Sequence, residues 1–451
     1  MAIRRVLVLV DDTSDVVMSA AMASGRSLQT SPRSPSGFVL DQSFPAVPVQ
    51  EAATTQLVNV MSMGMPASAA AGRAGADSYV VRGYMDDSDI SASIHPNGTT
   101  SVYADPEIAG FPTTCGGSQP VGNSLTVQQL IGVGLLNQLS MDGSGVALAI
   151  VDTGINLNHI RNKGLSPTLD QFASWTSSPS IQPGWGVVGH GTMCAYSALL
   201  IAPNATLLDH AVLNGVGSVP GGSAMSGVLS NALQSYSVLL RLMRQPAGRS
   251  RFHSLVVSNS WGMYSQSWDF PLGHPGRFGD NMNHPFNVIV SSLSAAGADI
   301  VFAAGNCGPH CPDGRCDSSP LPPIFLANSH DDVMCVAGVD TNGAVVGYSS
   351  EGPGVLGNRK PDIAGYTHYL GSEAFGPGVP DTGTSTACPV VAGVIASLRS
   401  AYPFLPGNPR RSPAQVRNFL RNHAQGSGQW TKDWGHGIIS TTQFPHAASV
   451  L

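Results

Sequence analysis

The chain has 451 residues, of which 42% are hydrophobic and 11% charged, and its formal net charge is -6. This length exceeds the usual size of one domain, so we expect a large unit with a smaller one attached. A net negative chain without dense Lys and Arg clusters lacks the cationic surface that binds phosphate backbones, which argues against a nucleic-acid partner. No apolar run approaches the ~20 residues that a membrane-spanning helix needs, so we expect no membrane span.

The amino-terminal segment shows no sustained periodicity. Two arginines precede an apolar run that Asp11 and Asp12 interrupt, and this run is too short for the core of a secretory signal. We therefore predict a disordered leader over residues 1–36. Without a signal, the pattern favours a cytoplasmic or non-classically exported protein and leaves secretion open.

Strand-like patterns begin after this leader. The stretches GFVLDQSF, DSYVVRGYM and TTSVYADPEI each have the composition of a strand, with a Met/Ala-rich segment between the first two. We predict a small α+β domain over residues 37–115. Turn-forming residues then predict a linker over 116–123.

From residue 124 to 451 the pattern alternates between strand and helix, which predicts a parallel sheet with crossover helices. A capping-box spacing between Thr126 and Gln129 precedes the first helical pattern. The expected strands are 145–151, 206–213, 254–260, 299–305 and 333–339. The expected helices are 130–139, 222–243, 285–297 and 413–424.

Two polar residues follow these elements at positions suited to chemistry. Asp152 ends the strand 145–151, at the edge of the sheet where open α/β folds bind ligands. His190 lies between two glycines at the start of a helical pattern, where little side-chain bulk hides the imidazole. Taken alone, such an Asp is more often a turn residue and such a His more often a helix cap.

Two further residues add possible reaction partners. Ser385 follows Gly383 and Thr384 at the start of a small-residue helix, where backbone N–H groups can face an anion. Asn306 follows the strand 299–305 in a tight turn, and its amide can donate to a developing oxyanion. Taken alone, they are more often a cap and a turn residue.

The motifs VDTG, GHGT, AAGN and GTSTACP occur in this order and together resemble the signatures of the subtilase family. The resemblance covers roughly residues 120–445. It implies a subtilisin-like three-layer α/β fold with a mostly parallel sheet, preceded by the small α+β domain. It also implies a serine endopeptidase that forms an acyl-enzyme on Ser385, with Asp152 orienting His190, His190 accepting the Ser385 proton and Asn306 in the oxyanion hole.

The resemblance also extends to substrate binding. The stretch SNSWG resembles the family's substrate-pairing strand, so Ser260, Trp261 and Gly262 should line the primary specificity pocket, with an extended peptide added as a strand. We expect a peptide or protein substrate and a monomeric enzyme. The domain at 37–115 resembles a propeptide, and we expect cleavage between about Ile108 and Val121. The same pattern also fits a permanent amino-terminal domain.

Seven cysteines, an odd number, do not indicate a disulfide framework. Cys307, Cys311 and Cys316 follow Asn306 closely, but their gaps are wider than those of a zinc knuckle, which leaves a disulfide, free thiols and zinc as alternatives. We expect no required cofactor. Structural calcium is common in the family, but no residues here can be matched to it. Cys388, close to the expected nucleophile, suggests sensitivity to thiol reagents.

Two alternative functions fit parts of the sequence. Asp-Thr-Gly occurs at 152–154 and at 381–383, and aspartic proteases use two such triplets. That mechanism needs a β-rich bilobal fold, which conflicts with the alternating strands and helices. The other alternative is a catalytically silent subtilase that only binds peptides.

Overall fold

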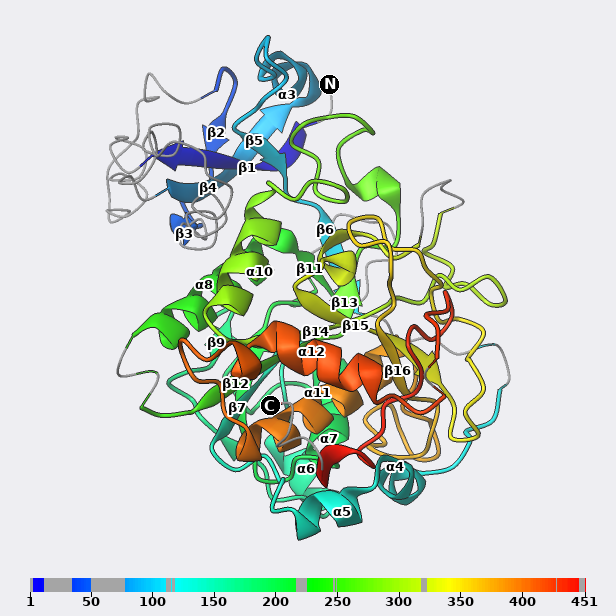
Figure 1. Cartoon of the computed structure of the whole chain (residues 1–451). Helices are drawn as coiled ribbons and strands as arrows, with labels where there is room; N and C mark the ends of the chain where they lie inside the picture. The colour runs from blue at the N-terminus through cyan, green and yellow to red at the C-terminus, as the bar shows by residue number, and fades with distance from the viewer. Residues whose placement is uncertain are drawn as a thin grey trace, which may run out of the picture.

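The computed structural model describes residues 3–11, 35–49, 78–110, 115, 118–215, 225–245, 248, 250–317, 323–426, 428–445 and 451. A small sheet formed by residues before 106, the amino-terminal unit, packs on a larger α/β unit, the main unit (Figure 1). Among the described residues, no helix combines the length and the apolar character needed to cross a bilayer.

The main unit is built on an eight-stranded sheet in which every strand pair is parallel, as the alternating pattern predicted. Its order is β16-β15-β14-β12-β7-β10-β8, and β9 also pairs with β10. The strands are β7 Val146–Asp152, β8 Thr168–Leu169, β9 Trp175–Thr176, β10 Thr206–Ala211, β12 Ser254–Asn259, β14 Asp299–Ala303, β15 Val333–Val339 and β16 Ile363–Tyr366.

Helices cover both faces of this sheet, because successive residues of a strand point to opposite faces and both faces here are apolar. In β7, Leu148 packs into the core under α7, α11 and α12, whereas Ala149 packs into the core under α8 and α10. The helices are α4 Ser124–Ile131, α5 Val133–Gln138, α6 Leu157–Asn162, α7 His190–Leu199, α8 Leu229–Arg244, α10 Pro285–Ala295, α11 Thr384–Ala401 and α12 Pro413–Asn422, with short 3-10 turns η2 Gln266–Trp268, η3 Leu326–Ser329 and η4 Pro409–Arg411.

The structure corrects two expected elements of the main unit. The first helix is capped by Asn123, which shares a capping box with Thr126, rather than by Thr126 itself. It breaks into α4 and α5 at Gly132, whose φ of 85° belongs to the left-handed region. The expected helix 222–243 begins instead with a short strand, β11 Ser226–Val228, before α8.

The amino-terminal unit is an antiparallel sheet in the order β2-β4-β1-β5, with β3 also on β4. The predicted leader over 1–36 is wrong for Ile3–Asp11, which forms the central strand β1: its apolar residues alternate, with Val8 in this unit's own core and Leu7 facing the main unit. The rest of the leader in 12–34, and the Met/Ala-rich segment, lie outside the described residues. The other elements are β2 Val39–Leu40, β3 Val47–Val49, β4 Ser78–Asp86, α3 Asp87–Ala92 and β5 Val102–Ala104.

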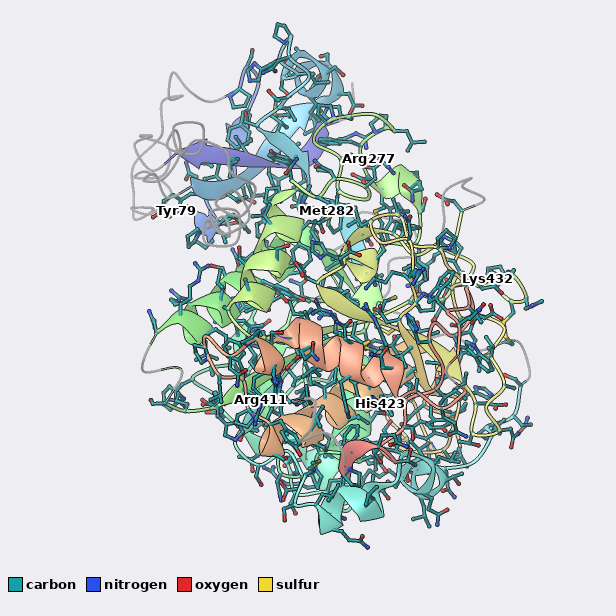
Figure 2. The ribbon with its side chains drawn as sticks, in the orientation of Figure 1. Tyr79, Arg277, Met282, Arg411, His423 and Lys432 are labelled. Atoms are coloured by element: carbon teal, nitrogen blue, oxygen red, sulfur yellow. A yellow bond between two sulfur atoms is a disulfide. The ribbon has the colours of Figure 1, made fainter. Side chains whose placement is uncertain are left out.

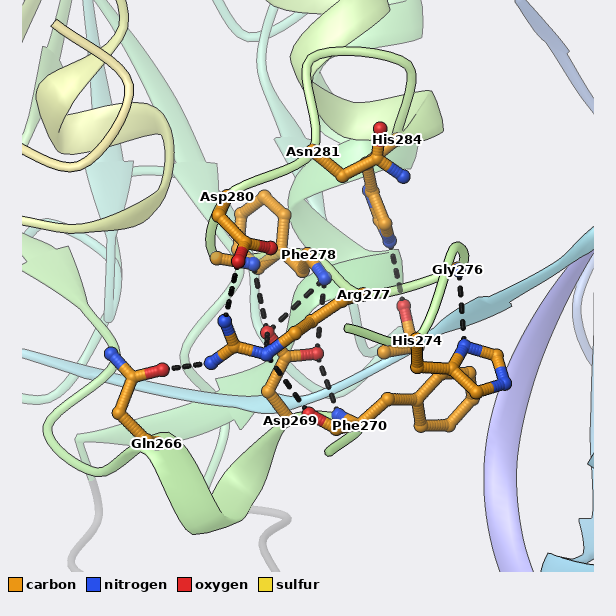
Figure 3. A network of polar contacts seen from close by, with 12 residues as sticks. Gln266, Asp269, Phe270, His274, Gly276, Arg277, Phe278, Asp280, Asn281 and His284 are labelled. Atoms are coloured by element: carbon orange, nitrogen blue, oxygen red, sulfur yellow. Dashed lines mark hydrogen bonds and ion pairs between the residues drawn. The ribbon is translucent and has the colours of Figure 1, made fainter. Parts of the chain in front are cut away.

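One loop of the main unit, residues 266–284, joins the two units (Figure 3). Its Phe270 is buried within the core of the amino-terminal unit, and its His284 Nε2 donates to the Ala104 carbonyl at 2.9 Å. Arg277, labelled beside the amino-terminal sheet in Figure 2, stiffens the loop by donating to the Phe270 carbonyl at 3.0 Å and to Asp280 at 2.9 Å. The loop therefore binds β5 through both apolar and polar contacts.

Candidate active site

The residues singled out in the sequence come from the carboxyl ends of adjacent strands and from two helix starts. Asp152 ends β7, Ser260 follows β12, and Asn306 lies just beyond β14. The chain leaves β7 in one direction along the sheet and reaches β12 in the other, so this edge lies at a topological switch point. The starts of α7 and α11 supply His190 and Ser385.

His190 and Asp152 form a buried, hydrogen-bonded pair. His190 Nδ1 lies 2.7 Å from Asp152 Oδ1, and both side chains are almost fully buried. The start of α7 is anchored because the Gly191 N–H donates to Thr153 Oγ1 at 2.9 Å. A Cβ on Gly191 would lie 2.5 Å from the Gly154 carbonyl oxygen, so only glycine permits this close approach. His190 Nε2 has no hydrogen-bond partner among the described residues.

Ser385 lies in the first turn of α11, on a backbone that Pro389 modifies. Proline has no N–H, so the Ser385 carbonyl loses its usual helical partner four residues on. That carbonyl instead accepts a hydrogen bond from Ser260 Oγ at 2.9 Å, and Ser385 Oγ donates to the Ser260 carbonyl at 3.1 Å. Pro389 lies inside the helix, beyond its first turn. These two hydrogen bonds between Ser385 and Ser260 fix the start of α11 to the end of β12.

Asn306 is fully buried beside the residue that precedes Ser385. Its Oδ1 accepts from the Thr384 N–H at 3.0 Å and from Thr384 Oγ1 at 2.9 Å. Because the oxygen is committed to Thr384, the NH2 group occupies the other end of the amide. The structure thus holds the amide against the start of α11, the region where backbone N–H groups favour negative charge.

Of the residues expected to line the specificity pocket, Trp261 and Gly262 form a short strand, and the Trp261 side chain is turned into the core. Trp261 and Gly262 form β13, but the Trp261 side chain is fully buried and packs edge-on against Phe286 and Phe302 in the core. The expectation that Trp261 lines the specificity pocket is therefore wrong for its side chain, because a side chain enclosed by the core presents no surface to a substrate.

A strand of the chain itself pairs with this backbone. β6 Glu107–Gly110 lies antiparallel between β11 and β13, with Gly110 opposite Trp261 and Ala109 opposite Gly262. All four residues of β6 are buried. The sequence predicted a strand here but placed it in the small domain. In the structure β6 lies beside His190, because a Cβ added to Gly110 would lie 3.1 Å from the His190 ring.

One cluster of side chains could in principle hold a metal. Asp152, His190 and Cys194 each place a ligand atom within 4.8 Å of the others. Metal binding needs a thiolate, but burial raises the pKa of the Cys194 thiol well above its ordinary value. Burial also raises the pKa of Cys388 to about 12, which argues against the expected sensitivity to thiol reagents. The cluster suits proton transfer better than metal binding.

Two disulfides replace the open alternatives for the cysteines near Asn306. Cys307 pairs with Cys316, and Cys311 pairs with Cys115. The expectation that seven cysteines form no disulfide framework is therefore wrong. The second bond joins residues 196 apart in the sequence. Spacing alone gives no sign of such a pairing.

The second Asp-Thr-Gly triplet does not form a carboxylate dyad with the first. Asp152 bonds to His190, whereas both oxygens of Asp381 accept hydrogen bonds from Ser372, through its N–H at 2.7 Å and its hydroxyl at 2.5 Å. Burial raises the pKa of Asp381 to about 7. With a parallel sheet in place of a bilobal β fold, the aspartic-protease alternative is not favoured.

Several known proteases have sequences similar to this chain. The chain is 26% identical to subtilisin DY of Bacillus licheniformis over 302 residues, which is 66% of this chain and 90% of that protein. It is 27% identical to the M-protease of Shouchella clausii (strain KSM-K16) over 363 residues, 78% of this chain and 77% of that protein. It is 25% identical to the serine protease AprX of Bacillus subtilis (strain 168), covering 67% of each. The profile of the subtilase family matches residues 143–437, and the chain belongs to this family of serine peptidases.

Proposed function

We propose that the chain is a serine endopeptidase in which Asp152 orients His190 and His190 accepts the proton of Ser385. The observation that carries this proposal is the buried 2.7 Å contact between His190 Nδ1 and Asp152 Oδ1. An Nδ1–H that donates to the carboxylate leaves Nε2 as the basic nitrogen. Ser385 Oγ, which donates to the Ser260 carbonyl, must turn toward Nε2 for the reaction.

The attack of Ser385 on a peptide carbonyl would generate an oxyanion at the start of α11. Backbone N–H groups of that helix and the Asn306 amide would stabilise it, and the Asn306 contact with Thr384 supports this role. Removing one such donor costs about 3 kcal/mol in barrier, a magnitude measured in subtilisin itself. Collapse of the tetrahedral intermediate would give an acyl-enzyme on Ser385, with His190 returning its proton to the leaving amine.

Substitution of Ser385 tests this proposal. We expect Ser385→Ala to abolish both peptide hydrolysis and labelling by a serine-directed phosphonate, and Asn306→Ala to lower kcat by about 10²–10³-fold. Ser397→Ala is the matched control, because Ser397 is buried in the same helix and donates to the Ile201 carbonyl instead. Unchanged hydrolysis by purified Ser385→Ala would overturn the endopeptidase proposal. A purified wild type that binds peptides but neither hydrolyses them nor takes up the phosphonate would favour the silent peptide-binding alternative.

The amino-terminal unit has a role of its own in this proposal. β6 lies between β11 and β13 as an added strand, which is how an extended peptide would bind. The amino-terminal unit and β6 after it would therefore act together as a propeptide, with β6 in the cleft, until the chain is cut between about Ile108 and Val121. Intact-mass measurements of active and inactive fractions test this. Activity confined to uncut molecules would contradict the propeptide role.

The disulfides Cys115–Cys311 and Cys307–Cys316 support a proposal about the compartment. Stable disulfides persist in oxidising environments and are rare in the cytosol. We therefore favour export over the cytoplasmic alternative. Mass spectrometry of protein isolated from its native source, with free thiols blocked at lysis, would find both bonds intact if the proposal holds and reduced if it fails.

A further inference from the structure

Two side chains outside the proposed catalytic set meet at the carbonyl of Gly110. Tyr264 Oη donates to this oxygen at 2.9 Å, and Arg315 Nη2 lies 3.4 Å from it. The same Arg315 nitrogen donates to Tyr264 Oη at 2.6 Å. The guanidinium therefore polarises the phenol that donates to the backbone of β6.

Both donors are also held by contacts that do not involve β6. Asp313 accepts from Arg315 Nε at 2.9 Å and from Nη2 at 3.0 Å, and the guanidinium stacks on the Tyr264 ring with its carbon 3.8 Å from the centroid. The Asp313 N–H donates to the Asn306 carbonyl at 2.9 Å, and the Cys307–Cys316 disulfide closes the loop. Burial raises the pKa of Tyr264 well above 10, which keeps the phenol protonated and able to donate.

The register of β6 identifies which substrate residue would occupy this place. Gly110 lies opposite Trp261, so the next residue of a peptide bound in this register comes opposite Ser260. The Ser260 carbonyl is the group to which Ser385 donates at 3.1 Å. The residue opposite Ser260 would therefore present its carbonyl to Ser385. The position of Gly110 corresponds to the second residue before the bond that is cut.

Space at this position is limited by the His190 ring. A Cβ added to Gly110 would lie 3.1 Å from Cε1 and 3.2 Å from Nδ1 of that ring, closer than ordinary contacts. Asp152 holds the ring through Nδ1, so a shift of the ring would disturb the hydrogen-bonded pair. A larger side chain at this substrate position would press on the group that must accept the proton.

We propose that Tyr264 and Arg315 are substrate-positioning residues that hold the carbonyl of the second residue before the cut, and that this position selects glycine. The proposal rests on the proposed function. Holding this carbonyl fixes the backbone one residue before the reacting carbonyl, where small displacements strongly lower the rate. Arg315 acts chiefly through Tyr264, which makes the shorter contact.

The test uses the full chain after its own processing, with active molecules counted by titration with a serine-directed phosphonate. The parent substrate is Ile-Ala-Gly-Phe linked to an aminocoumarin, and the second replaces the glycine carbonyl by a methylene. We expect Tyr264→Phe to lower kcat/KM on the order of tenfold for the parent and to leave the methylene peptide unaffected. Arg315→Lys should act in the same direction. Tyr369→Phe is the matched control, because this buried phenol donates to Ser197 and not to β6.

The specificity arm compares glycine with alanine in the parent peptide. We expect the wild type to prefer glycine by at least several-fold in kcat/KM. An equal loss in kcat/KM for Tyr264→Phe on the parent and on the methylene peptide would overturn this inference. No preference of the wild type for glycine over alanine would also overturn it. In both cases hydrolysis and phosphonate labelling would still support the endopeptidase. A wild type that neither hydrolyses peptides nor takes up phosphonate would overturn the proposed function, and this inference with it.

Discussion

The two sheets of the molecule complete their cores in different ways. The main sheet is enclosed by helices of its own unit on both faces. The amino-terminal sheet has a small core that includes Phe270, a side chain supplied by the main unit, and its other face packs through Leu7 and Val80 against the main unit. A small domain buries too little surface to be very stable alone. The amino-terminal unit therefore depends on the main unit far more than the reverse.

The largest expected effect lies inside the main unit. Arg399 and Asp299 form a buried bidentate ion pair, with contacts of 2.5 and 2.9 Å. Arg399→Met would leave a buried carboxylate uncompensated, which costs about 3–5 kcal/mol. Urea unfolding should show both units losing stability together. The double variant Arg399→Met with Asp299→Leu should recover much of the loss, and equal instability of the two variants would contradict the ion-pair explanation.

Loss of the Phe270 side chain, which the main unit contributes to the amino-terminal core, should destabilise the amino-terminal unit only. Phe270→Ala deletes a buried aromatic ring from the amino-terminal core, and such deletions cost about 3 kcal/mol or more. We expect faster hydrogen exchange in β1 and β4 with unchanged exchange in β7. Phe172→Ala, at a phenylalanine that is 93% exposed in the main unit, is the control. Equal exchange in β1 before and after Phe270→Ala would show that the unit holds together without it.

Acid should loosen the contact between the units through His284. Burial lowers its pKa to about 3, so its contribution to stability is complete above about 6.5 and falls as the pH drops toward 3. The slope is at most about 1.4 kcal/mol per pH unit, or about 2 kcal/mol between pH 6.5 and 5. His284→Gln should flatten this loss, measured by exchange of the Ala104 amide at both pH values. His210→Gln, at a buried histidine of the main unit, should not change the pH response of Ala104.

The smallest effect is expected at the surface of the amino-terminal unit. Arg4 and Asp87 form an ion pair with side chains 37% and 48% exposed. Exposed pairs contribute about 0–1 kcal/mol, so Arg4→Ala should scarcely change the urea midpoint and should lose any effect in high salt. A loss above 2 kcal/mol would mean that the unit depends on its surface charges and not on the main unit.

The sequence predicted the parts of the fold in which local pattern and final environment agree. The predicted strand 145–151 is apolar throughout, and the observed strand β7 is fully buried and ends at Asp152, where the motif required it. The four motif residues could be named because each lies in its own short signature. Their proposed roles remain predictions that the experiments above address.

The rest depended on contacts between distant segments. The alternating residues of β1 were masked by neighbouring arginines and aspartates, and only its pairing with β4 gives the apolar face a partner. Trp261 was expected to face a pocket because nothing local tells which side of a strand the core will cover. Tyr264 and Arg315 carry no motif at all. A Tyr and an Arg 51 residues apart gain meaning only when both reach the same carbonyl.

Because of the Cys115–Cys311 bond, the position of a maturation cut decides whether the amino-terminal piece is released or stays covalently attached. Cysteine 115 lies just beyond β6 in the chain and inside the interval in which we expect cleavage. A cut before it would release the amino-terminal piece as a separate molecule and leave the new end tethered beside Asn306. A cut after it would leave the piece covalently attached, and only a reductant could then let it diffuse away.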